Sequence, residues 1–150
     1  MTQAVSFDCV VDASVGIKFF LEEPLSDRAD MLFSHLSDNP PARFYVPNLF
    51  YIECTNILWK HVKRFDYPVD IARQNVTDLI ALPLRSIMME DLAEDALKLA
   101  THYNCSAYDA AYVALAKRLS LPLVTADMGL LRAFSHTDFD IRFVSDWPEL

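Results

Sequence analysis

Four acidic residues that lie far apart in the chain occupy positions where their carboxylates are expected to meet. Asp12 ends the apolar run "FDCVVD", and Asp127 directly follows the run "LPLVTA". Glu53 and Asp109 stand near the predicted starts of two helices, among apolar neighbours. An ionised carboxylate in such surroundings is unfavourable unless it takes up a proton, finds a cationic partner or binds a metal. No Lys or Arg is adjacent in sequence to any of the four.

Each of these acids also has a purely structural interpretation. Asp12 and Asp127 precede predicted helices and could cap them, and Ser106 with Asp109 matches the capping-box spacing. For any one acid, both interpretations remain open. The set favours chemistry, because four carboxylates at one edge of a cleft would repel one another by several kcal/mol unless a divalent ion neutralised them.

Two polar residues accompany the acids. Thr125 lies just inside the strand end that precedes Asp127. Asn56 comes three residues after Glu53 and therefore projects from the same helical face. Its amide could hydrogen-bond a ligating carboxylate or a phosphate.

The elements that must position these side chains follow an alternating pattern. Continuous apolar strands alternate with helical patterns, which is typical of an α/β fold whose parallel sheet is buried on both faces. In such a sheet the carboxyl ends of the strands line the crevice that binds ligands, so Asp12 and Asp127 are expected at one edge. The predicted strands are 7–12, 43–46, 83–89, 121–126 and 141–144, and the predicted helices are 13–23, 25–36, 48–64, 68–82, 90–104, 106–120 and 127–136.

Composition limits the classes of protein that fit. The 150 residues predict a single domain over 1–150, 53% of them are hydrophobic, and no apolar run approaches the roughly 20 residues of a membrane span. The N-terminus has no signal-peptide pattern, and Cys9, Cys54 and Cys105 are odd in number and widely separated, so a cytoplasmic protein with free thiols is expected. The net charge of -8 disfavours charge-driven binding of nucleic acid without a bound cation.

At the acidic positions the sequence resembles the PIN-domain ribonucleases, in particular the small toxins of the VapC type. The resemblance covers nearly the whole chain and rests on "VVDASV" with Asp12, "PNLFYIECTNIL" with Glu53 and Asn56, and "YDAAYVALAKRLSLPLVTAD" with Asp109 and Asp127. It implies a PIN-like α/β domain with a central, mainly parallel β-sheet flanked by α-helices. It also implies an endoribonuclease, a hydrolase that depends on Mg²⁺ or Mn²⁺, with a cognate antitoxin and a homodimeric state.

The resemblance assigns roles to individual residues. The four acids of the family fall on Asp12, Glu53, Asp109 and Asp127, and Ser14 and Thr125 match its frequent hydroxyl positions. Asp12 and Asp109 are expected to be the firmest metal contacts. Glu53 and Asp127 are expected to bind a second ion, to hold metal-bound waters or to orient the nucleophilic water.

Two other functions fit part of the pattern. A catalytically silent PIN-like scaffold would keep the fold and only bind a partner. A Mg²⁺-dependent phosphatase or phosphoacceptor domain would also gather acids at strand ends, but it would want a second acid close to Asp12, where this chain has "DAS".

Overall fold

The computed structural model describes residues 5–148 and contains one five-stranded sheet. The strand order is β3-β2-β1-β4-β5, and all four neighbouring pairs are parallel. This confirms the expected α/β class. The strands are β1 (Cys9–Val11), β2 (Phe44–Pro47), β3 (Arg85–Ile87), β4 (Leu123–Thr125) and β5 (Ile141–Phe143).

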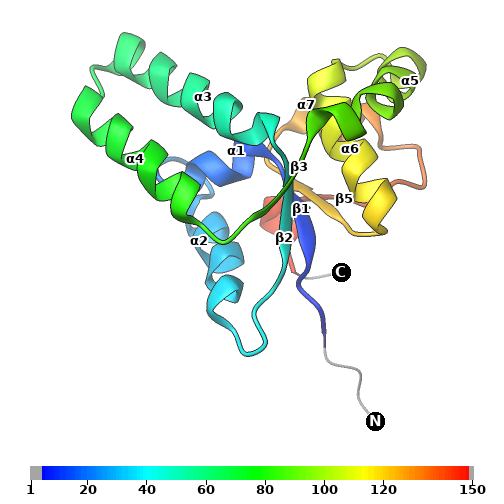
Figure 1. The fold of residues 1–150 in the computed structure, drawn as a ribbon, viewed down its shortest axis with the longest axis horizontal. Helices are drawn as coiled ribbons and strands as arrows, with labels where there is room; N and C mark the ends of the chain where they lie inside the picture. Colours follow the sequence, from blue (N-terminus) through cyan, green and yellow to red (C-terminus); the bar gives the residue numbers. More distant parts are fainter. Residues whose placement is uncertain (1–4, 149–150) are drawn as a thin grey trace.

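Helices cover both faces of this sheet. In Figure 1, α1 to α4 lie on one side of it and α5 and α6 on the other. The helices are α1 (Ala13–Gly16), α2 (Ser26–Ser34), α3 (Leu49–Phe65), α4 (Val69–Ala81), α5 (Ala93–Tyr103), α6 (Ala107–Leu119) and α7 (Met128–Ala133). Short 3-10 turns occupy Ile17–Phe19, His35–Ser37, Met89–Asp91 and Val144–Asp146. Within residues 5–148, no helix is both long enough and apolar enough to cross a membrane.

The central strands and α6 form the most buried part of the molecule. Every residue of β1 and β4 is 0% exposed, as expected for strands covered on both faces. Residues 110–116 of α6 are all buried, and four of these seven are alanines, whose small side chains let the helix lie close to β1 and β2. The carboxyl ends of β1 and β4 and the start of α6 are thereby held in a rigid core.

The first helix is shorter than predicted. A helix was expected over 13–23, but α1 ends at Gly16 and continues only as the 3-10 turn Ile17–Phe19. Glycine and the β-branched Val15 and Ile17 are weak helix formers, and close packing adds a second constraint. A Cβ at Gly16 would lie 2.5 Å from the ring of the fully buried Phe50 on α3. This contact sets α1, which follows Asp12, directly against α3.

The other elements appear in the predicted order, with ends that differ by a few residues. Four of the five strands are shorter than the runs that predicted them, and β3, for example, covers Arg85–Ile87 instead of 83–89. The strand β2 keeps the predicted length of four residues but is shifted by one, to Phe44–Pro47 instead of 43–46. The acidic stretch at 90–92 belongs mostly to a 3-10 turn, and α5 begins only at Ala93. The hydrophobic pattern therefore located each helix and strand, but it did not define the residue at which each one begins or ends.

We predict that Gly16→Ala lowers the free energy of unfolding by about 1–3 kcal/mol, because the added methyl group must displace the buried Phe50 ring. Urea denaturation would measure this. The chain has one other glycine, and Gly129→Ala is the matched control, since its Cβ meets only the exposed Asp127 carboxylate at 3.1 Å. Equal effects of the two substitutions would contradict the packing argument.

Candidate active site

Strand pairing brings the first pair of acids together. Asp12 directly follows β1, and Asp127 comes two residues after the end of β4. These two strands are neighbours in the sheet, with Val11 in register with Val124. The prediction that both acids lie at the carboxyl edge of the sheet is therefore confirmed.

Two hydroxyl groups fix the carboxylate of Asp12. Ser14 Oγ donates to Asp12 Oδ2 at 2.6 Å, and Thr125 Oγ1 donates to the same oxygen at 2.8 Å. The residue is only 6% exposed. Although Asp12 precedes α1, its side chain makes no capping hydrogen bond, so the capping interpretation of Asp12 is wrong. Within residues 5–148, no hydrogen bond reaches Oδ1, which leaves this oxygen available to a ligand.

The same hydroxyls connect the loops that follow β1 and β4. The backbone N–H of Ala126 donates to Ser14 Oγ at 2.9 Å, and that of Asp127 donates to Thr125 Oγ1 at 3.0 Å. Thr125 is fully buried. The two hydroxyl residues singled out in the sequence thus support Asp12 by fixing its carboxylate and the loop beside it.

Glu53 and Asp109 approach Asp12 from α3 and α6. Burial raises the pKa of Asp12 to about 6, the hydroxyls of Ser14 and Thr125 oppose this change, and the charges of Glu53 and Asp109 add to it. The pKa of Glu53 is also raised, first by burial and then by the charge of Asp109, against the hydrogen bond from a tyrosine described below. Carboxylates from three separate segments therefore interact electrostatically at one place.

Asp127 completes the set from a more exposed position. Burial raises the pKa of Asp109, and the charge of Asp127 raises it further, against the hydroxyl of Ser106. Asp127 is exposed, and its Oδ1 accepts from the N–H groups of Gly129 at 2.8 Å and Leu130 at 3.3 Å. The capping interpretation of Asp127 is thus confirmed. The cap uses only Oδ1, and Oδ2 takes no part in it.

The capping box at the start of α6 is half formed. Ser106 Oγ accepts from the N–H of Asp109 at 3.1 Å, so Ser106 caps the helix. In the part of the chain that the structure describes, no bond runs back from the Asp109 carboxylate to the N–H of Ser106. The cap is therefore supplied by Ser106, and the Asp109 carboxylate is not required for it.

Asn56 lies beside Glu53, as the helical spacing predicted. Both belong to α3 and help line a hollow of about 670 Å³ whose other lining residues are Leu49, Ile52, Thr55, Trp59 and Tyr108. Asn56 is exposed, and no hydrogen bond within residues 5–148 involves its side chain. Its amide is available to a ligand in the hollow.

Tyr112 was missed as a site residue, although it belongs to the motif "DAAYVALA". Its hydroxyl donates to Glu53 Oε1 at 2.7 Å, and the whole residue is 0% exposed. Burial and the nearby charges of Asp12 and Glu53 raise its pKa, so the hydroxyl remains a donor. Two features of the sequence could have identified it. Tyr112 follows Asp109 by one helical turn, and a buried tyrosine hydroxyl needs a partner.

Among the residues that the structure describes, the four acids have no cationic partner. None of the ion pairs within residues 5–148 involves Asp12, Glu53, Asp109 or Asp127. In this range, no three His, Cys, Asp or Glu side chains form a ready-made metal cage either. Carboxylate oxygens nevertheless fit a hard divalent ion, and Mg²⁺ in particular keeps several waters and needs only one or two direct carboxylates. The donor set therefore suits Mg²⁺ or Mn²⁺.

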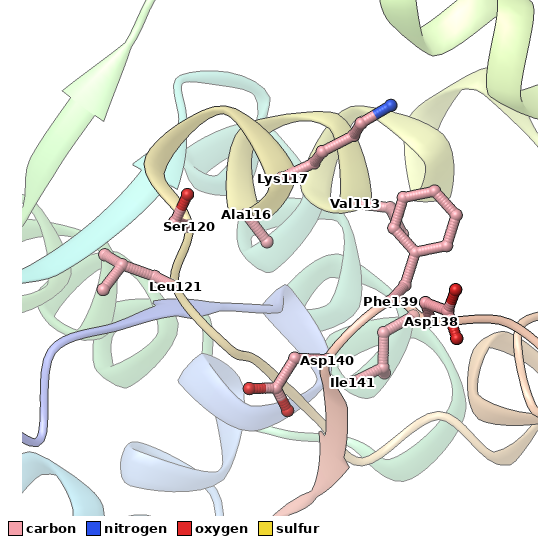
Figure 2. Close-up of a pocket in the computed structure, with 9 residues that line it drawn as sticks. All are labelled: Val113, Ala116, Lys117, Ser120, Leu121, Asp138, Phe139, Asp140 and Ile141. Carbon is pink, nitrogen blue, oxygen red and sulfur yellow. The ribbon is translucent and has the colours of Figure 1, made fainter.

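A second hollow lies at the opposite edge of the sheet. Its volume is about 240 Å³, and Figure 2 shows its lining residues Val113, Ala116, Lys117, Ser120, Leu121, Asp138, Phe139, Asp140 and Ile141. Leu121 precedes β4 and Ile141 begins β5, so this hollow borders the amino ends of the strands. It contains none of the four candidate acids.

The pKa of Asp12 gives a prediction for the metal-free protein. A folded-state pKa of about 6, against an ordinary value of 3.8, means that ionisation of Asp12 destabilises the fold by about 3 kcal/mol. This cost is absent below about pH 4 and complete above about pH 6. With EDTA present, Asp12→Asn should therefore be more stable than the wild type at pH 7, and the difference should shrink toward pH 4.

Urea denaturation across this pH range would test the prediction, with exposed Asp30→Asn as the control. The electrostatic account would be contradicted if Asp12→Asn were less stable than the wild type at pH 7. It would also be contradicted if the difference in stability between the two proteins did not change with pH.

Comparisons with known proteins identify the family. A family model described as "PIN domain" matches residues 9–136. The chain is 31% identical over 128 residues to Ribonuclease VapC3 from Pyrobaculum aerophilum, and the match covers 83% of this chain and 93% of that protein.

Two solved structures share the fold. The crystal structure of PAE2754 from Pyrobaculum aerophilum matches with a TM-score of 0.65 and 20% identity, over 92% of this chain and 90% of that one. A toxin-antitoxin complex from Klebsiella pneumoniae matches with a TM-score of 0.63 and 16% identity, over 91% and 98%. Because the family match spans most of the chain and brings in the strand ends and helices that carry all four acids, the protein belongs to the PIN-domain family.

Proposed function

We propose that this protein is a metal-dependent endoribonuclease that hydrolyses RNA phosphodiester bonds as the toxin of a toxin-antitoxin pair. The observation that carries the proposal is the buried Asp12 carboxylate, which interacts with the charges of Glu53 and Asp109 and has no cationic partner within residues 5–148. Membership of the PIN-domain family and similarity to a protein named as a ribonuclease support the same activity. They give no support to the phosphatase alternative.

The roles of the residues follow from their contacts. Asp12, through Oδ1, and Asp109 would hold the ion, while the hydroxyls of Ser14 and Thr125 keep the Asp12 carboxylate in one orientation. Glu53 and Asp127 would bind a second ion, hold its waters or orient the attacking water. When bound, Mg²⁺ or Mn²⁺ supplies a water of lowered pKa and stabilises negative charge on the scissile phosphate.

The proposal also accounts for how an acidic protein approaches RNA. With a formal net charge of -8, the protein as a whole repels a polyanion. A divalent ion among the four acids inverts the sign of the local field at the cleft. The side-chain amide of Asn56, next to Glu53 in the hollow, would hydrogen-bond a phosphate or a ligating carboxylate there.

We further propose two protein partners, a cognate antitoxin and a second copy of this chain. An apolar patch surrounds the hollow that Glu53 and Asn56 help to line. It consists of Ile52, Trp59 and Tyr108, which are 66%, 55% and 65% exposed. Large apolar side chains gathered on a surface are typical of an interface. We also propose a cytoplasmic location, which the three free cysteines support. A single domain over 1–150 completes the proposal, and it is supported by the one hydrophobic core cluster found within residues 5–148.

The proposed nuclease activity predicts that RNA cleavage is lost when the metal is removed or when a metal-binding acid is substituted. Purified protein should cleave labelled RNA with Mg²⁺ or Mn²⁺, and EDTA should abolish cleavage. Asp12→Asn and Asp109→Asn should each reduce the rate at least about 100-fold, because each removes a charged oxygen ligand of the ion. Asp30→Asn is the surface control. Cleavage that survives EDTA or either site variant would come from a contaminant, and no cleavage at all would favour the silent scaffold.

The apolar patch predicts the oligomeric state. Light scattering should give a mass twice the 17.1 kDa of the chain. Trp59→Glu should shift the protein toward monomer, because it places a charge in the patch. Leu97→Glu is the matched control, since Leu97 is 61% exposed on α5 and lies outside the patch. A monomeric wild type, or equal effects of the two variants, would contradict the dimer.

The proposed antitoxin predicts that this protein is toxic to the cell that produces it and that a protein encoded by an adjacent gene neutralises it. Overexpression should arrest growth, and coexpression of a small protein encoded next to this gene should relieve the arrest and copurify with the chain. Harmless overexpression of an active nuclease would contradict the toxin role without touching the proposed chemistry.

A further inference from the structure

We propose that Tyr112 is a positioning residue for Glu53: its hydroxyl occupies Oε1 and turns Oε2 toward the metal. The proposal rests on the function proposed above, because it assigns Glu53 a role at the ion. Its observation is the 2.7 Å hydrogen bond from Tyr112 Oη to Glu53 Oε1, which joins α6 to α3 across 59 positions of the sequence.

The hydroxyl of Tyr112 is a fixed point. The residue is 0% exposed and lies in the stretch 110–116 of α6, every residue of which is buried. This helix packs on β1 and β2, the centre of the sheet. A tyrosine ring has only two side-chain torsions, and in a close-packed core both are held by its neighbours. The position of the donor is therefore set by the fold.

The side chain of Glu53, in contrast to that of Tyr112, is not held in place by the core. Glu53 is only half-buried, and its longer side chain has three torsions, so without a partner it would sample several rotamers, and fixing one of them costs conformational entropy. Its neighbours Asp12 and Asp109 repel it, which favours rotamers that point away from the site. One hydrogen bond to a rigid donor selects a single rotamer against this repulsion.

The bond also limits how Glu53 can bind a metal. Oε1 accepts from Tyr112, whereas no hydrogen bond within residues 5–148 reaches Oε2, so Glu53 would bind a ligand chiefly through Oε2. Partners of metal ligands commonly change metal affinity by about 10- to 100-fold when they are removed. Asp109 and Tyr112 lie one turn apart on α6, so this helix both supplies an acid and orients another.

Tyr112→Phe is the direct test, because it removes only the hydroxyl and keeps the ring in the core. Calorimetric titration with Mn²⁺ should show an affinity about 10-fold weaker than that of the wild type. With RNA, kcat should fall while KM stays unchanged. Tyr67→Phe is the matched control, since it removes another tyrosine hydroxyl bonded to a buried residue, Asn75, at 2.6 Å. This control should bind Mn²⁺ as the wild type does.

A double-mutant cycle separates positioning from a merely structural role. If Tyr112 acts through Glu53, Tyr112→Phe should have no further effect on Mn²⁺ affinity in a Glu53→Ala background. Wild-type affinity in Tyr112→Phe, or the same loss with and without Glu53, would overturn the positioning role alone. A wild-type protein that binds no Mn²⁺, or whose binding survives Asp12→Asn, would overturn both this inference and the proposed function.

Discussion

Mutual repulsion of carboxylates at the edge of a buried sheet is the constraint on which the site depends. Asp12 is almost fully buried, and its raised pKa reflects lost solvation together with the charges of Glu53 and Asp109. Within residues 5–148, no lysine or arginine pairs with any of the four acids. The arrangement is therefore unfavourable in itself and must be imposed by the rest of the fold.

The fold imposes it through rigid elements and a few directed hydrogen bonds. Pairing of β1 with β4 fixes the two strand ends, and the buried face of α6 fixes the third segment. The hydroxyls of Ser14 and Thr125 then hold Asp12, and the hydroxyl of Tyr112 holds Glu53. Each donor is neutral, so it orients a carboxylate without cancelling its charge. Arginine or lysine at these positions would satisfy the acids and leave no reason to bind a cation.

Much of this organisation could be predicted from local sequence. Apolar runs that end in an acid located Asp12 and Asp127, because a parallel sheet gathers the carboxyl ends of its strands at one edge. Helical spacing placed Asn56 beside Glu53. The short α1 was not predicted, since its end depends on the approach of Gly16 to Phe50 on α3. Tyr112 was missed for the same kind of reason, because its partner lies 59 positions away and is set by tertiary packing.

The capping question shows why residue type alone could not decide function. Asp12 and Asp127 both stand at the N-cap of the helix that follows a strand, one residue after β1 and two residues after β4, yet only Asp127 caps its helix. The difference arises because Asp12 is enclosed by the hydroxyls of Ser14 and Thr125, whereas Asp127 is exposed and turns Oδ1 to the N–H groups of α7. The burial of each carboxylate, which only the folded chain defines, separates the two roles.

Either a proton or a divalent cation could relieve the repulsion among the carboxylates of the site. A proton on Asp12 would relieve the repulsion, but a group with a pKa of about 6 is mostly ionised near pH 7. Neutral hydroxyl donors lower this cost without removing it, and no side-chain cation of the described chain pairs with the acid. In the proposed function, a small ion from solution that several oxygens can share would balance these charges at neutral pH. Because the positive charge of that ion would lie at the cleft of an otherwise acidic protein, the carboxylates that repel one another would also direct a phosphate to the cleft.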